Sequence, residues 1–372
     1  MFKIIITIFL LIFSKSYAFE TMAKQAIILD YDTNEILYRK NSNEKCFPSS
    51  MTKIMTAYII FEKLDNGELK VNDKFTISNN AWKQEGSRMF LNINSKVSVD
   101  ELLKGLLVDS GNDSAIALAE GSYNSVEKFV EKMNLNAKKL KLKDTNYTNP
   151  VGFSEKNHYM SVRDIAKLSQ TLIKNFPNYY NKYFSIREYK YNNILQQNRN
   201  QLLGKFEGLD GIKTGHTEAG GYGIALSSKQ NNRRLIAVIN GLKTENERLN
   251  EGKRILDYGF NELHKFLLFE KNSIIKEIPI LYGKKKIAKL TTDKNIYATA
   301  KNKDDIKIEF IINNNIKAPL QKNQKVGKIV VKSLDNTIIY DLLNMEEVKE
   351  VNIFKKIFLK IYYFEKNFIL EK

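Results

Sequence analysis

Hydrophobic residues along the first half of the chain change from a strand-like to a helix-like period. Short apolar-rich runs at 25–30 and 35–39 flank a polar turn, which predicts a β-hairpin. From Ser50 to Asn66-Gly67 the residues are mostly apolar on all sides, which predicts a buried helix. The helical period returns at 99–107, from 113 to 121, and at 162–173.

The second half of the chain returns to strands before it ends in a different pattern. Strand-like runs at 222–228 and 234–242 are followed by a helical stretch at 245–258. Strands, then many helices, then strands and a helix predict an α/β layered domain whose sheet combines both ends of that region. Beyond Gly259-Phe260, short β-type runs separated by Gly, Asn and Lys predict a small all-β domain of about 80 residues.

The last residues have bulky apolar side chains at helical spacing, and the lysines lie largely on the other faces of the expected helix. The apolar set is Phe354, Ile357, Phe358, Ile361, Phe364, Phe368 and Ile369. A basic helix with such a face suits insertion at a membrane interface. A helix packed on its own protein, or one that mediates oligomerisation, is the alternative.

The first residues have the pattern of an export signal. Lys3 precedes the apolar run 4–13, and Ser16-Tyr17-Ala18 offers small residues where a signal peptidase cleaves. An apolar run of about ten residues is short of the roughly 20 needed to span a bilayer, although an uncleaved anchor is the alternative. We therefore predict four parts: a signal at 1–18, an α/β domain at 19–264, a β-rich domain at 265–346 and an amphipathic anchor helix at 347–372.

Charge and composition change this prediction little. The formal net charge is +17, but lysines are spread along the whole chain and no basic segment with interleaved aromatic residues stands out. We therefore expect no nucleic-acid partner. The charge favours attraction to anionic phospholipid or to an anionic wall polymer.

Histidine and metal chemistry are poorly supported. The chain has only His158, His216 and His264, none beside a G-x-S-x-G motif, and no His or Cys pair has ligand spacing. We expect no metal and no cofactor. The base for a nucleophilic serine must then come from another residue type.

Ser50-Met51-Thr52-Lys53 supplies such a base. On a helix, Lys53 lies one turn from Ser50, and burial of its amine lowers the pKa so that it can accept the serine proton. The spacing alone is weak, because the S-x-x-K pattern also begins at Ser42, Ser125 and Ser273. Only Ser50 precedes an apolar helix that would bury the lysine.

Two further segments contain polar groups suited to the same reaction. In Ser110-Gly111-Asn112, the serine can relay a proton and the asparagine can bind lysine or a substrate carbonyl, although helix capping explains such residues equally well. Lys213-Thr214-Gly215-His216 places a cation and a hydroxyl beside a glycine, which lets a substrate backbone approach and holds a carboxylate.

In this order, S-x-x-K, S-x-N and K-T-G form the signature of penicillin-binding proteins and serine β-lactamases. The sequence resembles the D-alanyl-D-alanine carboxypeptidase family of low-molecular-mass penicillin-binding proteins, of the peptidase S11 type. The resemblance also rests on the following segments: 48–53, 109–113, 149–152, 161–164, 208–216, and Arg248 ahead of 256–260. It implies a β-lactamase/transpeptidase-like domain, with an antiparallel sheet flanked by helices, ahead of the β-rich domain and the terminal helix.

The resemblance also implies a reaction and a role for each residue. Ser50 attacks the penultimate D-alanine of a peptidoglycan stem, Lys53 is its base, Ser110 protonates the leaving amine, and Asn112 orients groups. The substrate carboxylate is held by Lys213, Thr214 and Arg248, with Gly215 allowing close approach, and the oxyanion is held by backbone N–H groups of Ser50 and His216. β-Lactam antibiotics are then covalent inhibitors, and the enzyme works as a peripheral protein at the periplasmic face of the cytoplasmic membrane.

Three other functions remain open at this point. A D,D-endopeptidase would cleave cross-links between stems with the same residues. A class A β-lactamase needs a glutamate for deacylation, and there is no convincing E-x-x-N motif between Asn112 and Lys213. A catalytically inactive wall-binding or scaffolding protein would not need the intact Ser50, Lys53, Ser110 and Lys213.

Overall fold

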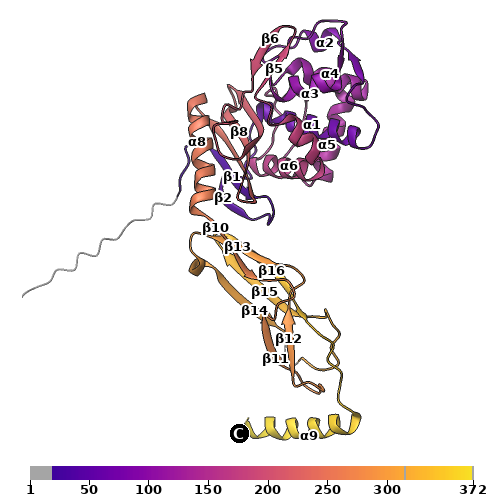
Figure 1. Ribbon diagram of the computed structural model, residues 1–372, viewed down its shortest axis with the longest axis vertical. Helices are drawn as coiled ribbons and strands as arrows, with labels where there is room; N and C mark the ends of the chain where they lie inside the picture. Colours follow the sequence, from indigo (N-terminus) through magenta and orange to yellow (C-terminus); the bar gives the residue numbers. More distant parts are fainter. Residues whose placement is uncertain (1–18, 314–315, 371–372) are drawn as a thin grey trace, which may run out of the picture.

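A computed structural model describes residues 19–313 and 316–370, with side chains described as far as residue 361. The predicted export signal, 1–18, lies outside the described residues. The chain forms a larger domain of strands and helices, an elongated β-domain below it, and a terminal helix at the far end (Figure 1).

A five-stranded antiparallel sheet forms the middle of the larger domain, in the order β2-β1-β9-β8-β7. The N-terminal strand β1 pairs with β9, with Ile27 opposite Val238, so the sheet combines both ends of the domain, as the pattern predicted. The strands are β1 (Gln25–Asp30), β2 (Ile36–Lys40), β7 (Leu209–Thr217), β8 (Gly221–Gln230) and β9 (Arg233–Leu242).

Alternate side chains of this sheet enter two different cores, because successive residues of a strand point to opposite faces. Ile27 and Val238 join the core that contains α1 and α6, whereas Ile28 and Ala237 join the core that contains α8. Figure 1 shows α8 on one side of the sheet and the other labelled helices of this domain on the opposite side. The helices are α1 (Lys53–Asp65), α2 (Asn79–Trp82), α3 (Val99–Leu107), α4 (Asn112–Tyr123), α5 (Val126–Lys139), α6 (Val162–Asn175), α7 (Pro177–Tyr183) and α8 (Glu245–Asp257).

The buried helix begins slightly later than the sequence suggested. Ser50 lies in a 3₁₀ turn, η1 (Ser49–Thr52), and α1 starts only at Lys53. A 3₁₀ turn is a common first turn of an α-helix. Two small hairpins complete the domain: β3 (Lys74–Thr76) with β4 (Lys96–Ser98), and β5 (Glu188–Tyr191) with β6 (Ile194–Gln197).

The second domain is built from antiparallel strands around its own core. A π-helical turn, η2 (Tyr258–Glu262), leads into β10, which pairs with β13, and the remaining strands form a sheet in the order β11-β12-β16-β15-β14. The elements are β10 (His264–Phe269), β11 (Lys276–Pro279), β12 (Ile287–Thr291), β13 (Ile296–Ala300), η3 (Lys303–Asp305), β14 (Lys307–Ile312), β15 (Lys325–Ser333) and β16 (Asn336–Asn344).

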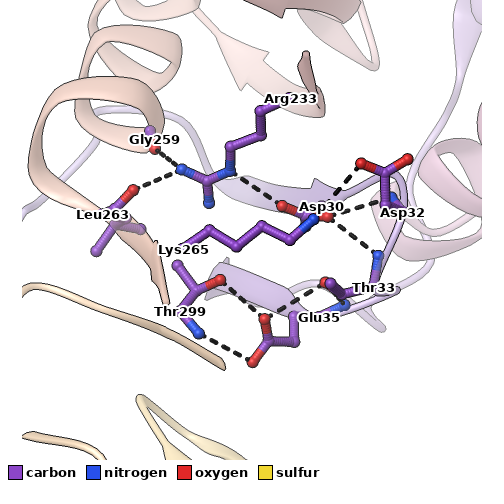
Figure 2. Close-up of polar contacts among 9 residues, drawn as sticks. All are labelled: Asp30, Asp32, Thr33, Glu35, Arg233, Gly259, Leu263, Lys265 and Thr299. Carbon is purple, nitrogen blue, oxygen red and sulfur yellow. Dashed lines mark hydrogen bonds and ion pairs between the residues drawn. The ribbon is translucent and has the colours of Figure 1, made fainter. Parts of the chain in front are cut away.

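A buried carboxyl group joins the two domains. Glu35, in the turn between β1 and β2, accepts hydrogen bonds from Thr299 Oγ1 (2.8 Å) and Thr299 N (3.3 Å) on β13, and from Ser333 Oγ (3.3 Å) on β15. Burial raises the pKa of this carboxyl, and the hydrogen bonds from Thr299 oppose the shift. Figure 2 shows Thr299 and the β1–β2 turn meeting at Glu35.

Arg233 fixes the chain where it passes from one domain to the other. Its Nε donates to Asp30 Oδ2 (3.0 Å), and its Nη1 donates to the carbonyl oxygens of Gly259 (3.3 Å) and Leu263 (2.5 Å) (Figure 2). Lys265 Nζ lies 3.6 Å from Asp32 Oδ2. The junction therefore has specific polar contacts rather than a free linker.

The terminal helix α9 (Ile353–Leu370) lies beyond the β-domain, at the opposite end from the larger domain (Figure 1). Along its described side chains, the exposed large apolar residues recur at helical spacing: Ile353, Phe354, Ile357, Phe358 and Ile361. Within the described residues, no helix combines the length and the apolar character needed to cross a bilayer.

Candidate active site

The turn that carries Ser50 is packed between two glycines. A Cβ at Gly152 would lie 1.8 Å from the carbonyl oxygen of Ser49, and the φ of Gly152 is +94°. A Cβ at Gly215, on β7, would lie 2.7 Å from the carbonyl oxygen of Pro48. Both neighbouring segments therefore approach the serine turn more closely than a side chain would allow, which fixes the position of Ser50.

Lys53 is fully buried at the start of α1, and its amine has three acceptors. It lies 3.0 Å from Ser50 Oγ, 2.7 Å from Asn112 Oδ1 and 3.1 Å from the carbonyl oxygen of Val151. Burial lowers the pKa of Lys53 to about 7, against the opposing charge of Asp113. A large fraction of the amine is therefore neutral near pH 7 and can accept the proton of Ser50.

The carbonyl group of Val151 is held toward Lys53 by an asparagine turn. Asn149 Oδ1 accepts hydrogen bonds from the backbone N–H groups of Gly152 (2.7 Å), Phe153 (3.0 Å) and Val151 (3.3 Å). An asparagine that bonds its own following backbone stabilises such a turn without regular structure. The Asn-Pro-Val-Gly segment thus supplies one of the three acceptors of Lys53.

A second serine–lysine pair lies opposite the first. Ser110, between α3 and α4, has a positive φ of +60°, and its Oγ accepts a hydrogen bond from Lys213 Nζ at 2.9 Å. Lys213 is buried, and burial, followed by the charge of Lys53, holds its pKa well below the usual value. Each serine hydroxyl therefore has its own buried amine for proton transfer.

The residues after Lys213 continue along β7 into the open part of the site. Thr214 is buried, whereas the His216 ring is exposed and stacks on Tyr222, with ring centroids 3.8 Å apart. Arg248, on α8, is 4% exposed, pairs with Glu245, and has its guanidinium 5.5 Å from the Tyr222 ring centroid. A cation and hydroxyl groups are thus available on one side of Ser50.

These residues surround one hollow of about 360 Å³. Its lining is Ser50, Gly86, Ser87, Ser110, Arg199, Thr214, Gly215, His216, Tyr222, Glu245 and Arg248. Lys53 and Lys213 lie buried behind this lining and donate hydrogen bonds to Ser50 and Ser110, respectively. Asn112 is also buried and accepts a hydrogen bond from Lys53. The fold therefore brings together every residue that the three motifs and Arg248 nominated, although they come from η1, α1, α4, β7, α8 and a loop.

Several residues at the site were not identified from the sequence. Arg199 and Tyr222 line the hollow, yet neither belongs to a recognisable local pattern. Asp109, beside Ser110, is 1% exposed and neither carboxyl oxygen has a hydrogen-bond partner within the described part of the chain. Burial, with the charge of Asp113 second, raises the pKa of Asp109 to about 7.

His158 contacts the turn that contains Ser50 through a hydrogen bond to Thr52. Its Nδ1 accepts the backbone N–H of Thr148 (3.1 Å), so its Nε2 carries the proton and donates to Thr52 Oγ1 (2.9 Å). Burial lowers the pKa of His158 to about 4, which keeps the ring neutral. This histidine is a positioning residue of the turn that contains Ser50, and it does not line the hollow.

Comparison with known proteins assigns the family. The family model described as D-alanyl-D-alanine carboxypeptidase matches residues 13–244. This chain belongs to the D-alanyl-D-alanine carboxypeptidase family. A second model, described as the C-terminal domain of penicillin-binding protein 5, matches residues 264–350. The family, enzyme class and fold predicted from the motifs are therefore confirmed.

Relatives of the D-alanyl-D-alanine carboxypeptidase family match most of the chain. The carboxypeptidase DacF of Bacillus subtilis is 39% identical over 318 residues, which covers 83% of this chain and 81% of the relative. The solved structure of penicillin binding protein 5 from Haemophilus influenzae has a TM-score of 0.77 and 35% identity, and the match covers 90% of this chain and 99% of that one. Penicillin-Binding Protein D2 from Listeria monocytogenes, solved in a cefotaxime-bound form, matches with a TM-score of 0.61 and 26% identity, over 66% of this chain and all of that one.

Proposed function

We propose that this enzyme is a serine-type D-Ala-D-Ala carboxypeptidase that removes the terminal D-alanine from peptidoglycan stem pentapeptides. The observation that carries this proposal is the buried amine of Lys53, 3.0 Å from Ser50 Oγ, with its pKa lowered to about 7. A serine hydroxyl becomes a nucleophile when an adjacent base can take its proton. Membership of the carboxypeptidase family supports the choice of substrate.

Acylation begins with the transfer of the Ser50 proton to Lys53. Ser50 Oγ then attacks the carbonyl carbon of the penultimate D-alanine, and the amide C–N bond breaks as the terminal amine receives a proton through Ser110. Backbone N–H groups of Ser50 and His216 stabilise the oxyanion, a contribution of about 3 kcal/mol per donor in other serine enzymes. Water hydrolyses the resulting ester and releases the shortened stem.

The terminal carboxylate of the substrate is held beyond Ser50 by Lys213, Thr214 and Arg248. Arg248 and Thr214 line the hollow, and Lys213 lies directly behind Ser110. A guanidinium group binds a planar carboxylate through two parallel hydrogen bonds, which fixes the orientation of the scissile amide as well as its position.

β-Lactam antibiotics should acylate the same serine. The cefotaxime-bound form of Penicillin-Binding Protein D2 supports this for a relative with the same fold. The deciding experiment is covalent labelling by a fluorescent penicillin, which Ser50→Ala should abolish. Ser273→Ala is the matched control, because Ser273 also begins an S-x-x-K pattern but lies in the β-domain, and it should label normally.

Product analysis separates the proposed activity from its alternatives. The enzyme should release free D-alanine from a pentapeptide muropeptide. Release of no D-alanine, with fast turnover of penicillin, would favour a β-lactamase. Retained labelling in Ser50→Ala would overturn the assignment of the nucleophile.

We also infer that the protein is exported and works as a peripheral protein at the periplasmic face of the cytoplasmic membrane. The export pattern of residues 1–18 and the exposed apolar side chains of α9 support this placement. Phe354 and Phe358 are 81% and 68% exposed, and a helix with such a face gains free energy by lying in the interface of a bilayer.

A further inference from the structure

A cavity that no step of the proposed reaction uses lies between the five-stranded sheet and α6. Its volume is about 420 Å³, and none of its lining residues belongs to the active-site hollow. Its walls come from α6, from β1 and β2, and from the loop after α5. We call it the β1–α6 cavity. Its volume falls in the range of cavities that bind small molecules, about 300–1,000 Å³.

One wall of the β1–α6 cavity is apolar. Ile27 and Leu29 are alternate residues of β1, so their side chains lie on the same face of the sheet. Ile36 on β2 pairs with Leu29, and Ala166 adds to this wall from α6. An apolar chain that covers the wall gains free energy, because apolar surface is removed from water.

The rest of the lining includes four cations. Arg163 and Lys167 lie one turn apart on the same face of α6, and Lys141 and Lys143 are exposed on the loop after α5. None of the four forms an ion pair within the part of the chain that the structure describes. Arg163 Nε is buried and has no hydrogen-bond partner among the described residues. A buried donor without an acceptor costs free energy until an acceptor is supplied.

Two carboxyl groups on the lining only partly balance these cations. Asp164 is buried, and its Oδ2 accepts hydrogen bonds from Asp144 N (2.7 Å) and from Thr145 Oγ1 (2.8 Å). Asp144 is the other carboxyl group, and it is half-buried. Four cations against two carboxylates leave an excess of positive charge, which favours an anionic ligand.

The walls of the cavity are tied together by hydrogen bonds. Gln170 Nε2, on α6, donates to the carbonyl oxygen of Tyr31 (2.7 Å) and to Asn34 Oδ1 (2.8 Å) in the turn between β1 and β2. At the start of the same helix, Arg163 N donates to the carbonyl oxygen of Ser42 (3.0 Å). The site is therefore formed before a ligand arrives, which lowers the cost of binding.

The position of the cavity argues against a lipid that stays in the membrane. The β1–α6 cavity belongs to the larger domain, and the β-domain lies between that domain and α9 (Figure 1). Under the proposed membrane attachment through α9, the ligand must reach the cavity through water. A single apolar chain with one charged group meets this requirement.

We propose that the β1–α6 cavity binds a medium-chain carboxylate, the chemical class of a free fatty acid. The chain lies along Ile27, Leu29 and Ile36, and the carboxylate pairs with the guanidinium group of Arg163. A guanidinium group binds a planar carboxylate through two parallel hydrogen bonds, which supplies the acceptor that Arg163 lacks. This binding does not depend on the reaction proposed for Ser50.

The test compares two probes that differ only in charge, octanoate and 1-octanol, by isothermal titration calorimetry of the full-length protein. The wild type should bind octanoate about tenfold more tightly than 1-octanol, because only octanoate pairs with Arg163. Arg163→Gln should remove this difference and leave the affinity for 1-octanol unchanged. Acetate, which has the charge but not the chain, should bind roughly 100-fold more weakly than octanoate.

The matched control is Lys174→Gln, because Lys174 is an exposed cation of the same helix that does not line the cavity. It should bind both probes as the wild type does. Labelling by penicillin at the wild-type rate shows that Arg163→Gln is folded. If that variant does not fold, Lys143→Gln takes its place, and it should weaken octanoate a few-fold without affecting 1-octanol.

Three results would overturn the proposal: equal binding of octanoate and 1-octanol by the wild type, equal losses of both in the cavity variant, or acetate binding as tight as that of octanoate. The apolar side chains of α9 are a second place where a chain could bind, so the titrations are repeated with Phe354→Glu/Phe358→Glu. Octanoate binding should persist in that variant. Its complete loss would place the octanoate on α9 and also overturn the proposal.

Discussion

Lys213 Nζ donates a hydrogen bond to Ser110 Oγ across 2.9 Å, although the two residues are 103 positions apart in the chain. The amine is buried, and the charge of Lys53 is the second cause that lowers its pKa. Two buried amines that repel each other's protons hold fewer than two charges near neutral pH. Proton transfer at Ser50 and at Ser110 is therefore coupled through these lysines.

The first prediction concerns the pH dependence of acylation. Lys53 must be neutral to accept the Ser50 proton, and its pKa is about 7. The rate of acylation by penicillin should therefore fall about tenfold for each pH unit below 7 and level off above it. Stopped-flow labelling between pH 5.5 and 8.5 measures this profile, and a flat profile would exclude Lys53 as the base. Lys53→Arg, which keeps the cation, should slow acylation on the order of 10²–10⁴-fold.

The second prediction compares Gly152 and Gly67. Both have a positive φ, but only Gly152 is closely packed. Gly152→Ala introduces a Cβ 1.8 Å from the Ser49 carbonyl oxygen at a φ of +94°. Gly67→Ala has a similar φ of +73° but meets nothing within 4 Å. We expect Gly67→Ala to cost about 1 kcal/mol of stability and to leave acylation unchanged.

Gly152→Ala should cost more stability and should slow acylation at least tenfold, because the Ser49 backbone must move and Ser50 moves with it. Denaturation midpoints and penicillin-labelling rates of the two variants provide the measurement. Identical labelling rates for both variants would show that the close approach at Gly152 does not position Ser50.

The third prediction concerns the domain junction. Burial raises the pKa of Glu35, so the folded chain binds this proton more tightly than the unfolded chain does. That contribution to stability is complete below the unfolded pKa and is lost as the pH rises through the higher folded pKa. The stability of Glu35→Gln relative to the wild type should therefore increase as the pH rises from 4 to 7.

Urea denaturation midpoints at the two pH values measure this difference. Glu309→Gln is the control, because Glu309 is an exposed carboxyl on β14. The pH dependence of the Glu35→Gln difference should exceed that of this control. A difference for Glu35→Gln that is constant with pH would mean that Glu35 has the same pKa in the folded and unfolded chains.

The fourth prediction concerns the terminal helix. Phe354→Glu/Phe358→Glu replaces the two most exposed apolar side chains in the described part of α9, up to residue 361, with charges and should move the protein from the membrane to the soluble fraction. Each phenylalanine contributes about 1.5–3 kcal/mol on burial, so the loss exceeds tenfold in partition. Leu135→Glu, at a 61% exposed leucine of α5, is the control and should leave the distribution unchanged. An unchanged distribution of the α9 variant would favour a helix that packs on protein.

The sequence predicted the chemical groups of the site better than their surroundings. The serine and lysine motifs are short and local, so Ser50, Lys53, Ser110 and Lys213 could be found without knowledge of the fold. The apolar run after Ser50 also predicted the burial that lowers the pKa of Lys53. The sequence predicted that the helix starts at Ser50, whereas α1 starts at Lys53, because the 3₁₀ turn at Ser50 depends on packing against Gly152 and Gly215.

Other features depended on contacts that no local pattern records. Arg199 enters the site from the segment after β6, Asp109 is isolated by the packing around it, and His158 reaches Thr52 from a loop 106 residues away. The junction at Glu35 has the same origin, since its partners lie 264 and 298 residues further along the chain. Such pairs become visible only when distant segments are placed together.

The position of α9, at the opposite end of the molecule from the domain that contains α1, gives the β-domain the role of a spacer under the proposed membrane attachment (Figure 1). A catalytic domain on a spacer of fixed length would reach only the layer of the wall at the corresponding distance from the lipid surface. Small soluble peptides should be indifferent to the length of the spacer, whereas stems fixed in the wall should not. Shortening the β-domain would then change which layer of the wall is trimmed without changing the chemistry at Ser50.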